Sequence, residues 1–295
     1  MDFGQLITAM VTPFDERGEI DFDATKNLLE HLIKTGTDAV VVAGTTGESP
    51  TLSTEEKLEL FSFVIKEANG RIPVIAGTGT NNTKASIELT KEAEKLGADG
   101  IMLVAPYYNR PNQDGLYAHF KAIAEETDLP IMIYNIPGRT ACNIEVDTIV
   151  KLSEIDNIVS VKEASGNLDA MAEIIERTKD GFVLYSGDDS LTLPVLAIGG
   201  KGIVSVASHI VGDAMKEMIE AFNRGDIEKA GAIHRKLLPT FKALFSAPSP
   251  APLKAVLNLT GIPVGDVRLP LVPLNEEQVE VLKQHINVNE LKVGK

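Results

Sequence analysis

The chain has 295 residues, with 28 lysines and arginines against 42 aspartates and glutamates, which gives a formal net charge of −14. This acidic balance argues against a nucleic-acid partner, and any site for an anionic substrate must be locally positive. Hydrophobic residues make up 44% of the chain and charged residues 24%, a composition that excludes a disordered protein and is typical of a globular one.

A single cysteine, Cys142, excludes an internal disulfide framework and a multi-cysteine metal site, and it is typical of a reducing compartment. The N-terminal sequence MDFGQLITAM lacks the basic start and apolar stretch of a signal peptide. No apolar run approaches the ~18 residues of a membrane span. We therefore expect a cytoplasmic protein without a membrane partner.

Short apolar runs rich in β-branched residues alternate along the chain with segments of helical periodicity. In chain order, the predicted strands are Leu6–Val11, Asp38–Val42, Ile72–Ala76, Gly100–Val104, Pro130–Tyr134, Ile158–Lys162, Phe182–Ser186 and Gly202–Val206. The predicted helices that follow them are Asp21–Thr35, Ser53–Asn69, Asn82–Leu96, Gln113–Glu126, Val146–Ser153, Asp169–Thr178, Leu191–Ile198 and Val211–Asn223. Continuously apolar strands are buried on both faces, as in a parallel sheet covered by helices.

Eight strand–helix units in about 225 residues have the count and length of a closed (β/α)8 barrel, whereas a doubly wound open sheet usually has fewer strands. We therefore predict an α/β fold with a (β/α)8 TIM barrel over residues 1–224. After Gly225 the alternation stops, and residues 225–295 are predicted to form a small helical appendage. Its three helices are Ile227–Phe245, Ala251–Leu259 and Glu276–Ile286.

In such barrels the chemistry lies at the C-terminal ends of the strands. Hydroxyl groups, a lysine and an arginine are concentrated just there, in the segments 44–48, 77–79, 106–111, 134–139, 162–166 and 187–189. We expect these side chains to converge on one rim. Glycine pairs such as Gly77-x-Gly79 and Gly199-Gly200 spell neither a P-loop nor a dinucleotide fingerprint, so they are interpreted as turns.

Lys162 ends the sixth predicted strand, so its amine should project into the barrel mouth, where partial desolvation lowers its pKa. A neutral lysine amine can attack a ketone and form a Schiff base. The alternative is a structural lysine paired with a carboxylate such as Glu163 or Asp188. Arg139, held by the tight turn at Pro137-Gly138, suits bidentate binding of a carboxylate, and its alternative is a loop salt bridge.

Imine chemistry requires proton transfers, and the usual carrier, histidine, is misplaced here. Four of the five histidines fall within predicted helices, namely His31, His119, His234 and His285, and only His209 lies just past a strand. This distribution disfavours a histidine metal site. Proton transfer would then fall to threonines and to three tyrosines of the rim, although packing is the alternative role of each: Tyr107, Tyr108 and Tyr134.

The segments 44–48 (GTTGE), 134–139 (YNIPGR) and 162–166 (KEASG) together resemble the dihydrodipicolinate synthase family, within the pyruvate-dependent class I lyase and aldolase superfamily. The likeness extends over nearly the whole chain. It implies condensation of pyruvate with L-aspartate 4-semialdehyde to 4-hydroxy-tetrahydrodipicolinate, the first committed step of diaminopimelate and lysine biosynthesis. No metal or other cofactor is implied beyond the covalent imine.

The resemblance also implies catalytic roles. Lys162 would form the Schiff base with pyruvate, and Thr46 and Tyr134 would relay protons together with Tyr108 of a neighbouring subunit. A tyrosine donated across an interface would make oligomerisation part of catalysis. The family likeness implies a homotetramer built as a dimer of tight dimers.

Substrate-binding roles are implied in the same way. Thr45 and Thr46 would hold the pyruvate carboxylate through hydroxyl and backbone N–H groups. Arg139 would bind the carboxylate of the semialdehyde, and the backbone at Gly187 and Val204 would complete the pocket.

The chain departs from family members that lysine inhibits, which resemble one another in carrying two histidines and a glutamate at the dimer interface. The matching positions here are Thr54, Lys57 and Ala85, although three other positions of a vestigial effector site remain: Ser49, Asn81 and Tyr107. Lys57 would place a cation opposite the amine of the inhibitor lysine, and Ala85 lacks the carboxylate that would pair with that amine. We therefore predict weak or absent feedback inhibition by lysine.

Three alternatives stay open. An N-acetylneuraminate lyase or 2-keto-3-deoxy sugar-acid aldolase would use the same lysine, although Arg139 favours a small acidic aldehyde and the Tyr107-Tyr108 pair favours the synthase relay. A metal-dependent class II aldolase is disfavoured by the placement of the histidines. The third is a barrel without catalysis, serving as a sensor or structural partner.

Overall fold

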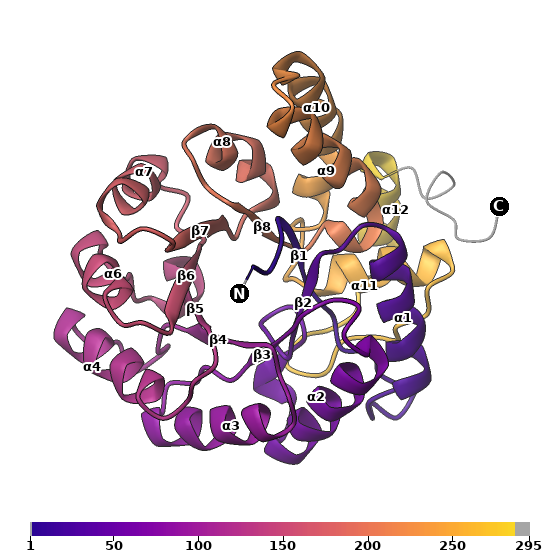
Figure 1. Ribbon diagram of the computed structural model, residues 1–295. Coiled ribbons are helices and arrows are strands. Elements are labelled where there is room, and N and C mark those ends of the chain that lie inside the picture. Colours follow the sequence, from indigo (N-terminus) through magenta and orange to yellow (C-terminus); the bar gives the residue numbers. More distant parts are fainter. Residues whose placement is uncertain (1, 287–295) are drawn as a thin grey trace.

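The computed structural model describes residues 2–286 and has a closed barrel of eight parallel strands, β1 to β8, paired in chain order (Figure 1). The strands are β1 (Leu6–Ala9), β2 (Ala39–Val42), β3 (Val74–Gly77), β4 (Gly100–Val104), β5 (Ile131–Asn135), β6 (Ile158–Glu163), β7 (Val183–Ser186) and β8 (Gly202–Ser205). Pairing of β8 with β1, with Leu6 opposite Ile203, closes the barrel. The predicted (β/α)8 fold is therefore confirmed.

Helices form a ring around the strands (Figure 1). Those that follow a strand are α1 (Phe22–Lys34), α2 (Thr54–Ala68), α3 (Thr83–Lys95), α4 (Gln113–Ala124), α6 (Val146–Ser153), α7 (Leu168–Arg177), α8 (Thr192–Ala197) and α9 (Ser208–Asn223). Local chemistry sets their starts. At α2, for example, Ser53 Oγ accepts the Glu56 N–H at 3.1 Å, and the Glu56 carboxylate accepts the Ser53 N–H at 2.8 Å. This reciprocal capping box satisfies two of the free N–H groups of the first turn.

The sequence prediction misplaced one helix start and missed three short helices. Helix α9 begins at Ser208, whereas the prediction began it at Val211, where the backbone leaves helical geometry with φ −132°. The missed helices have three or four residues each, too few for a periodic pattern: η1 (Ser49–Thr51), α5 (Pro137–Thr140) and η2 (Asp189–Leu191). All three lie in the loops that follow strand ends, where the site forms.

Two layers of apolar side chains hold the barrel. One lies between sheet and helices, and the other fills the interior of the barrel with residues from alternate strand positions: Ile7, Ala9, Val41, Ile75, Met102, Met132, Tyr134, Tyr185 and Val204. Filling of the interior is typical of this architecture and leaves a packed core instead of a channel. Any cavity must therefore open near the strand ends.

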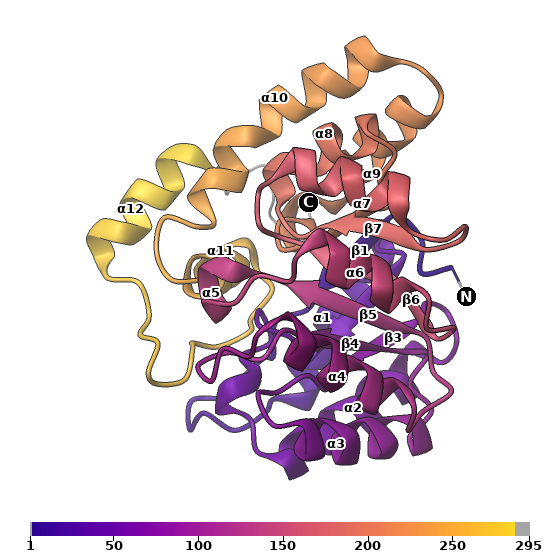
Figure 2. The ribbon, with the colours of Figure 1, turned by 90° about the vertical axis from the view of Figure 1, so that its left-hand side faces the viewer.

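After the barrel, the described chain continues in α10 (Ile227–Ala243), α11 (Ala251–Thr260) and α12 (Glu276–His285), in agreement with the three predicted helices. Helix α10 packs on α9 and α8, and α12 packs on α10 and α11 (Figure 2). Side chains from α10, α11 and α12 belong to the same apolar core as the barrel helices. The proposed division at residue 224 stays a prediction, and residues 287–295 of the predicted appendage lie outside the described residues.

The close contact at Gly202, where the barrel closes, predicts that one added methyl group will strongly destabilise the fold. A Cβ added at Gly202 would lie 2.0 Å from the carbonyl oxygen of Gln5, the atom that accepts the Ile203 N–H and so joins β8 to the start of β1. Gly202→Ala should therefore lower the free energy of unfolding by about 3 kcal/mol, measured by thermal or denaturant unfolding.

The matched control is Gly231→Ala within α10, where the nearest atom to the new methyl group is a movable Arg235 side-chain nitrogen at 3.2 Å. Alanine favours a helix over glycine by about 0.5–1 kcal/mol, so this variant should be as stable as the parent or more so. Equal midpoints for the two variants would contradict the role of Gly202.

Candidate active site

Lys162 lies inside the barrel near the C-terminal end of β6. Its register partners are Tyr134 on β5 and Tyr185 on β7, and its side chain is only 4% exposed. The Nζ atom lies 4.1 Å from the centre of the Tyr134 ring. Burial disfavours the ammonium ion and lowers the pKa of Lys162 to about 7, so a large fraction of the amine is neutral near neutral pH.

The two carboxylates considered as structural partners of Lys162 are engaged elsewhere. Glu163 accepts a hydrogen bond from Asn135 Nδ2 at 2.8 Å, and Asp188 accepts from the backbone N–H and hydroxyl of Ser190. Burial is also more complete than the partial desolvation expected from the sequence. The arrangement therefore favours a reactive amine over a structural ion pair.

Asp189 is the charged group that the sequence did not single out. The carboxylate is buried and accepts the Ser205 hydroxyl at 2.5 Å and the N–H groups of Val206 and Ala207 at 3.2 and 3.0 Å. Burial raises the pKa of Asp189 to about 6, and these hydrogen bonds oppose the rise. Its negative charge in turn raises the pKa of Lys162 against desolvation.

Asp189 could have been suspected because it follows a predicted strand, as Asp188 does. The sequence does not reveal which of two adjacent aspartates turns inward, because that depends on the short helix η2 directly after β7. Asp188 caps this helix from outside, whereas Asp189 enters the core.

Tyr134 lies next to the lysine, and the Thr45 side chain lies near Tyr134. Tyr134 is buried, which raises the pKa of its hydroxyl to about 12, while the charge of Arg139 and the nearby Thr45 side chain oppose the rise. Thr46 is buried and Thr45 is half-buried at the cavity. The structure therefore brings Thr45 to the Tyr134 hydroxyl, whereas the relay implied by the resemblance uses Thr46.

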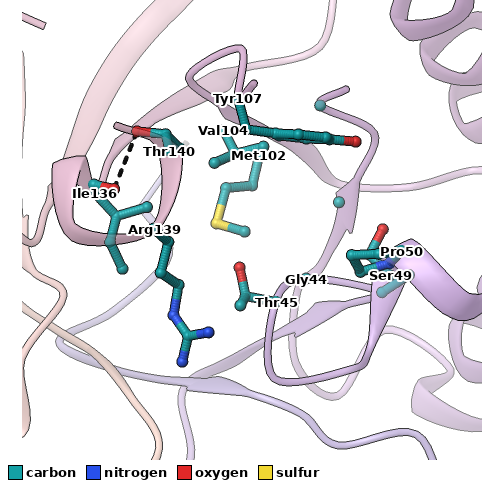
Figure 3. A pocket seen from close by; sticks show the side chains of 13 residues that line it. Gly44, Thr45, Ser49, Pro50, Met102, Val104, Tyr107, Ile136, Arg139 and Thr140 are labelled. Carbon is teal, nitrogen blue, oxygen red and sulfur yellow. Dashed lines mark hydrogen bonds between the residues drawn. The ribbon is translucent and has the colours of Figure 1, made fainter. Parts of the chain in front are cut away.

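A cavity of about 240 Å³ opens at the C-terminal ends of β2 to β5, and Figure 3 shows the side chains around it. Thr45 lies at one side of this cavity, and Arg139 of helix α5 lies at its exposed mouth. A guanidinium beside a hydroxyl makes the cavity locally positive, which an acidic chain needs in order to bind an anion. Met102, Val104 and Ile136 supply apolar walls.

Gly187 and Val204 lie on the β7 and β8 side of the lysine. A Cβ added at Gly187 would lie 2.6 Å from the Ala164 Cβ and 3.2 Å from the Lys162 Cε, so glycine allows the chain to pass close to the amine. Val204 is buried in the interior layer of the barrel. Gly187 therefore lies beside the lysine, whereas the role of both residues as a pocket wall stays a prediction.

The three tyrosines of the rim do not all converge within one chain. Tyr107 lines the cavity, and Tyr134 is buried beside Lys162. Tyr108 is 91% exposed and has a left-handed backbone with φ 72°, which turns its side chain away from the tyrosine before it. Its ring is therefore available to another molecule rather than to its own cavity.

The three positions predicted to form a vestigial effector site lie together at the cavity edge. Ser49 and Tyr107 line the cavity, and Asn81 Nδ2 donates to the Tyr107 carbonyl at 3.1 Å. Lys57 on α2 is half-buried, and its burial lowers its pKa.

Histidines are absent from the described cavity lining. All five lie in helices, including His209, which the prediction placed just past a strand because it began α9 too late. Its ring is buried, with Nδ1 bonded to the Val206 carbonyl and Nε2 accepting the Val11 N–H. Within residues 2–286, no three His, Cys, Asp or Glu side chains are grouped so that they could hold a metal ion. In the same residues, no helix combines the length and apolar character that crossing a bilayer requires.

A closed barrel with a buried, partly neutral lysine beside a tyrosine at the strand ends defines the class of lysine-dependent barrel lyases. Residues 2–289 match the model of the dihydrodipicolinate synthetase family. The chain therefore belongs to this family, as the sequence resemblance indicated.

Named relatives are similar to this protein over almost the full length of the chain. The chain is 60% identical over 283 residues to the 4-hydroxy-tetrahydrodipicolinate synthase of Oceanobacillus iheyensis, with 96% of both chains covered. The crystal structure of a dihydrodipicolinate synthase from Bacillus anthracis is similar with a TM-score of 0.96 and 55% identity, covering 100% of both chains. A dihydrodipicolinate synthase from Cyanidioschyzon merolae, solved with lysine bound, has a TM-score of 0.96 and 49% identity, covering 98% of this chain and 99% of that one.

The charges around Lys162 predict how imine formation depends on pH. The neutral amine is the nucleophile, so the rate of reductive trapping with a small keto acid should rise as the pH increases through about 7 and then level off. Asp189→Asn removes a negative charge that raises the pKa of Lys162, and this midpoint should fall by about one pH unit.

The matched control is Asp188→Asn, because this neighbouring carboxylate bonds to Ser190 and should leave the midpoint in place. A midpoint that rises in the Asp189 variant, or one that moves equally in both variants, would contradict the assignment.

Proposed function

We propose that the protein condenses pyruvate with L-aspartate 4-semialdehyde to 4-hydroxy-tetrahydrodipicolinate, through a Schiff base on Lys162. The observation that carries this proposal is the burial of the Lys162 amine in the barrel, with its pKa lowered to about 7. Membership of the family and relatives named 4-hydroxy-tetrahydrodipicolinate synthase support the same reaction.

The chemistry begins at the lysine. The neutral amine attacks the C2 carbonyl of pyruvate and forms a carbinolamine. A proton donated to its hydroxyl group lets that group leave as water, and the resulting iminium ion acidifies the neighbouring methyl group. A proton leaves that methyl group, the resulting enamine carbon attacks the aldehyde carbon of the second substrate, and the aldehyde oxygen takes up a proton to become the hydroxyl group of the product. The amino group of that substrate then attacks the imine carbon, closes the ring and releases the lysine amine. These steps need no metal or organic cofactor.

Proton transfer is assigned to the buried tyrosine. A pKa of about 12 keeps the Tyr134 hydroxyl protonated at neutral pH, so it can pass a proton along a chain of hydroxyls without itself remaining charged. The Thr45 side chain lies near this hydroxyl. Thr46, one residue along the same turn, would contribute its hydroxyl or its backbone N–H to the pyruvate carboxylate.

Arg139 is assigned to the carboxylate of the semialdehyde. It is exposed and lines the cavity, and its charge lowers the pKa of both Lys162 and Tyr134. A planar guanidinium forms two parallel hydrogen bonds with a carboxylate, which fixes the orientation of the substrate. The backbone at Gly187 and Val204 would complete the wall next to the imine.

Trapping of the imine tests this function directly. Pyruvate followed by borohydride should add one reduced pyruvyl group, and peptide mapping by mass spectrometry should place it on Lys162. Lys162→Ala should fold with an unchanged circular dichroism spectrum and form no adduct, because its amine is gone. Lys229→Arg changes an exposed lysine of α10 that pairs with Glu217, and this variant should still be labelled at position 162. An adduct on another nitrogen would refute the assignment.

Tyr108 is proposed to act in the active site of a neighbouring subunit. Its exposed side chain and left-handed backbone support a role outside its own cavity. A homotetramer of tight dimers and a cytoplasmic location stay predictions.

Complementation between two inactive variants tests this transfer. Lys162→Ala and Tyr108→Phe should each lose most activity, by about 10²-fold or more. Mixed and allowed to exchange subunits, they should regain activity, because a hybrid dimer has one site with an intact lysine and an intact partner tyrosine. If Tyr108 served its own chain, every site in the mixture would stay defective and no activity would return.

Feedback by lysine is predicted to be weak or absent. Lys57 places a cation where lysine-inhibited members carry a histidine, and Ala85 lacks the carboxylate that would pair with the amine of lysine. About 1 mM lysine should leave the rate unchanged in a coupled assay. The triple change Thr54→His, Lys57→His and Ala85→Glu restores the pattern and should bring inhibition into that range. Half-inhibition of the parent protein at low micromolar lysine would contradict the prediction.

A further inference from the structure

The turn that carries Thr45 and Thr46 has an unusual backbone at both ends. Ala43 and Glu48 flank it with left-handed φ angles of 53° and 56°, although neither is glycine. L-residues rarely adopt this conformation, and it persists where surrounding contacts fix it. Within the turn, the Glu48 N–H donates to the Thr45 carbonyl at 3.1 Å, and Thr12 Oγ1 donates to the Gly47 carbonyl at 2.7 Å.

The side chain of Glu48 is anchored by the C-terminal part of the chain. Its Oε1 lies 2.7 Å from Nζ of Lys254 on α11, and the two side chains are 1% and 2% exposed. Its other oxygen, Oε2, accepts the backbone N–H of Arg268 at 2.9 Å. Both oxygens of a buried carboxylate that belongs to the turn are thus held from beyond the barrel.

Lys254 is itself fixed on several sides. Its Nζ donates to the Asp266 carbonyl at 2.9 Å and lies 4.1 Å from the centre of the Phe14 ring. The Arg268 guanidinium lies 4.3 Å from the same ring and forms an ion pair with Glu56 of α2. Burial lowers the pKa of Lys254 to about 8, and the charge of Glu48 opposes this fall.

A buried ion pair is a poor means of stabilising a fold, because the cost of removing both charges from water offsets most of their attraction. Two apolar residues of similar size would serve stability equally well. What an ion pair adds is direction, since a carboxylate must approach an ammonium ion at a defined place. Here the ion pair fixes the position of Glu48, the last residue of the proposed substrate-binding turn.

We propose that Glu48 and Lys254 are positioning residues, whose buried ion pair holds the turn at residues 44–48 in the conformation that presents Thr45 and Thr46 to the carboxylate of the keto acid. Helix α11 is then a structural part of the substrate-binding site. This inference rests on the proposed function, in which the turn binds pyruvate.

The test compares Lys254→Met, Glu48→Gln and the double variant with the parent protein. Reductive trapping on Lys162 is followed against pyruvate concentration, because the pair does not touch β6. In all three variants the half-saturating pyruvate concentration should rise, by roughly 10- to 100-fold if the turn shifts by about 1 Å. The maximal extent of trapping should stay near that of the parent protein.

The double variant separates positioning from stability. Each single change leaves one buried charge without its partner and should lower the unfolding midpoint, whereas the double change removes both charges and should recover most of it. Positioning predicts that the raised pyruvate requirement persists in the double variant. If pyruvate binding recovers together with stability, or never changes, the proposal is overturned.

Hydrogen exchange supplies a readout that needs no substrate. Amides of residues 44–48 should exchange faster in the double variant, with β6 unchanged, and unchanged exchange in the turn would refute the inference by itself. Lys229→Met is the matched control, because it breaks an exposed ion pair with Glu217, 2.7 Å long, between α10 and α9. It should leave both readouts unaltered. A parent protein that forms no pyruvate adduct would refute the proposed function, and the exchange data would still decide the inference.

Discussion

The structure depends on placing one amine where water cannot solvate its charge. The barrel wall surrounds Lys162 with apolar side chains and the ring of Tyr134, and desolvation brings its pKa down to about 7. Nucleophilic chemistry at neutral pH follows from this burial alone, without a metal or a neighbouring base. Burial disfavours the ammonium form of Lys162. The negative charge of Asp189 partly offsets this effect, because it raises the pKa of the lysine.

The charged groups around the site lie at different depths, with the negative group buried and the positive group exposed. A carboxylate lies in the core behind the lysine, held by Ser205 and by the N–H groups of Val206 and Ala207 just before α9. A guanidinium, Arg139, lies at the exposed mouth, where it lowers the pKa of both Lys162 and Tyr134. The entrance is thus locally positive although the chain carries a net charge of −14, as the proposed binding of substrate carboxylates requires.

Much of this arrangement could be predicted from the sequence, because its cause is local. Apolar runs marked the strands, and the last residue of one run marked Lys162. What could not be predicted depends on turns and on distant contacts: Asp189 in place of Asp188 as the inward carboxylate, and the pairing of Glu48 with Lys254. A single left-handed residue or a three-residue helix can reverse the direction in which a side chain points. Hydrophobic periodicity in the sequence does not predict such short changes of the backbone.

Gly187 carries a consequence for engineering of the pocket. Because a methyl group there would already press on Ala164 and on the lysine's own Cε, the wall next to the reactive nitrogen has no spare space. Efforts to accept bulkier keto acids would have to enlarge another part of the cavity, such as the apolar wall at Met102 and Val104.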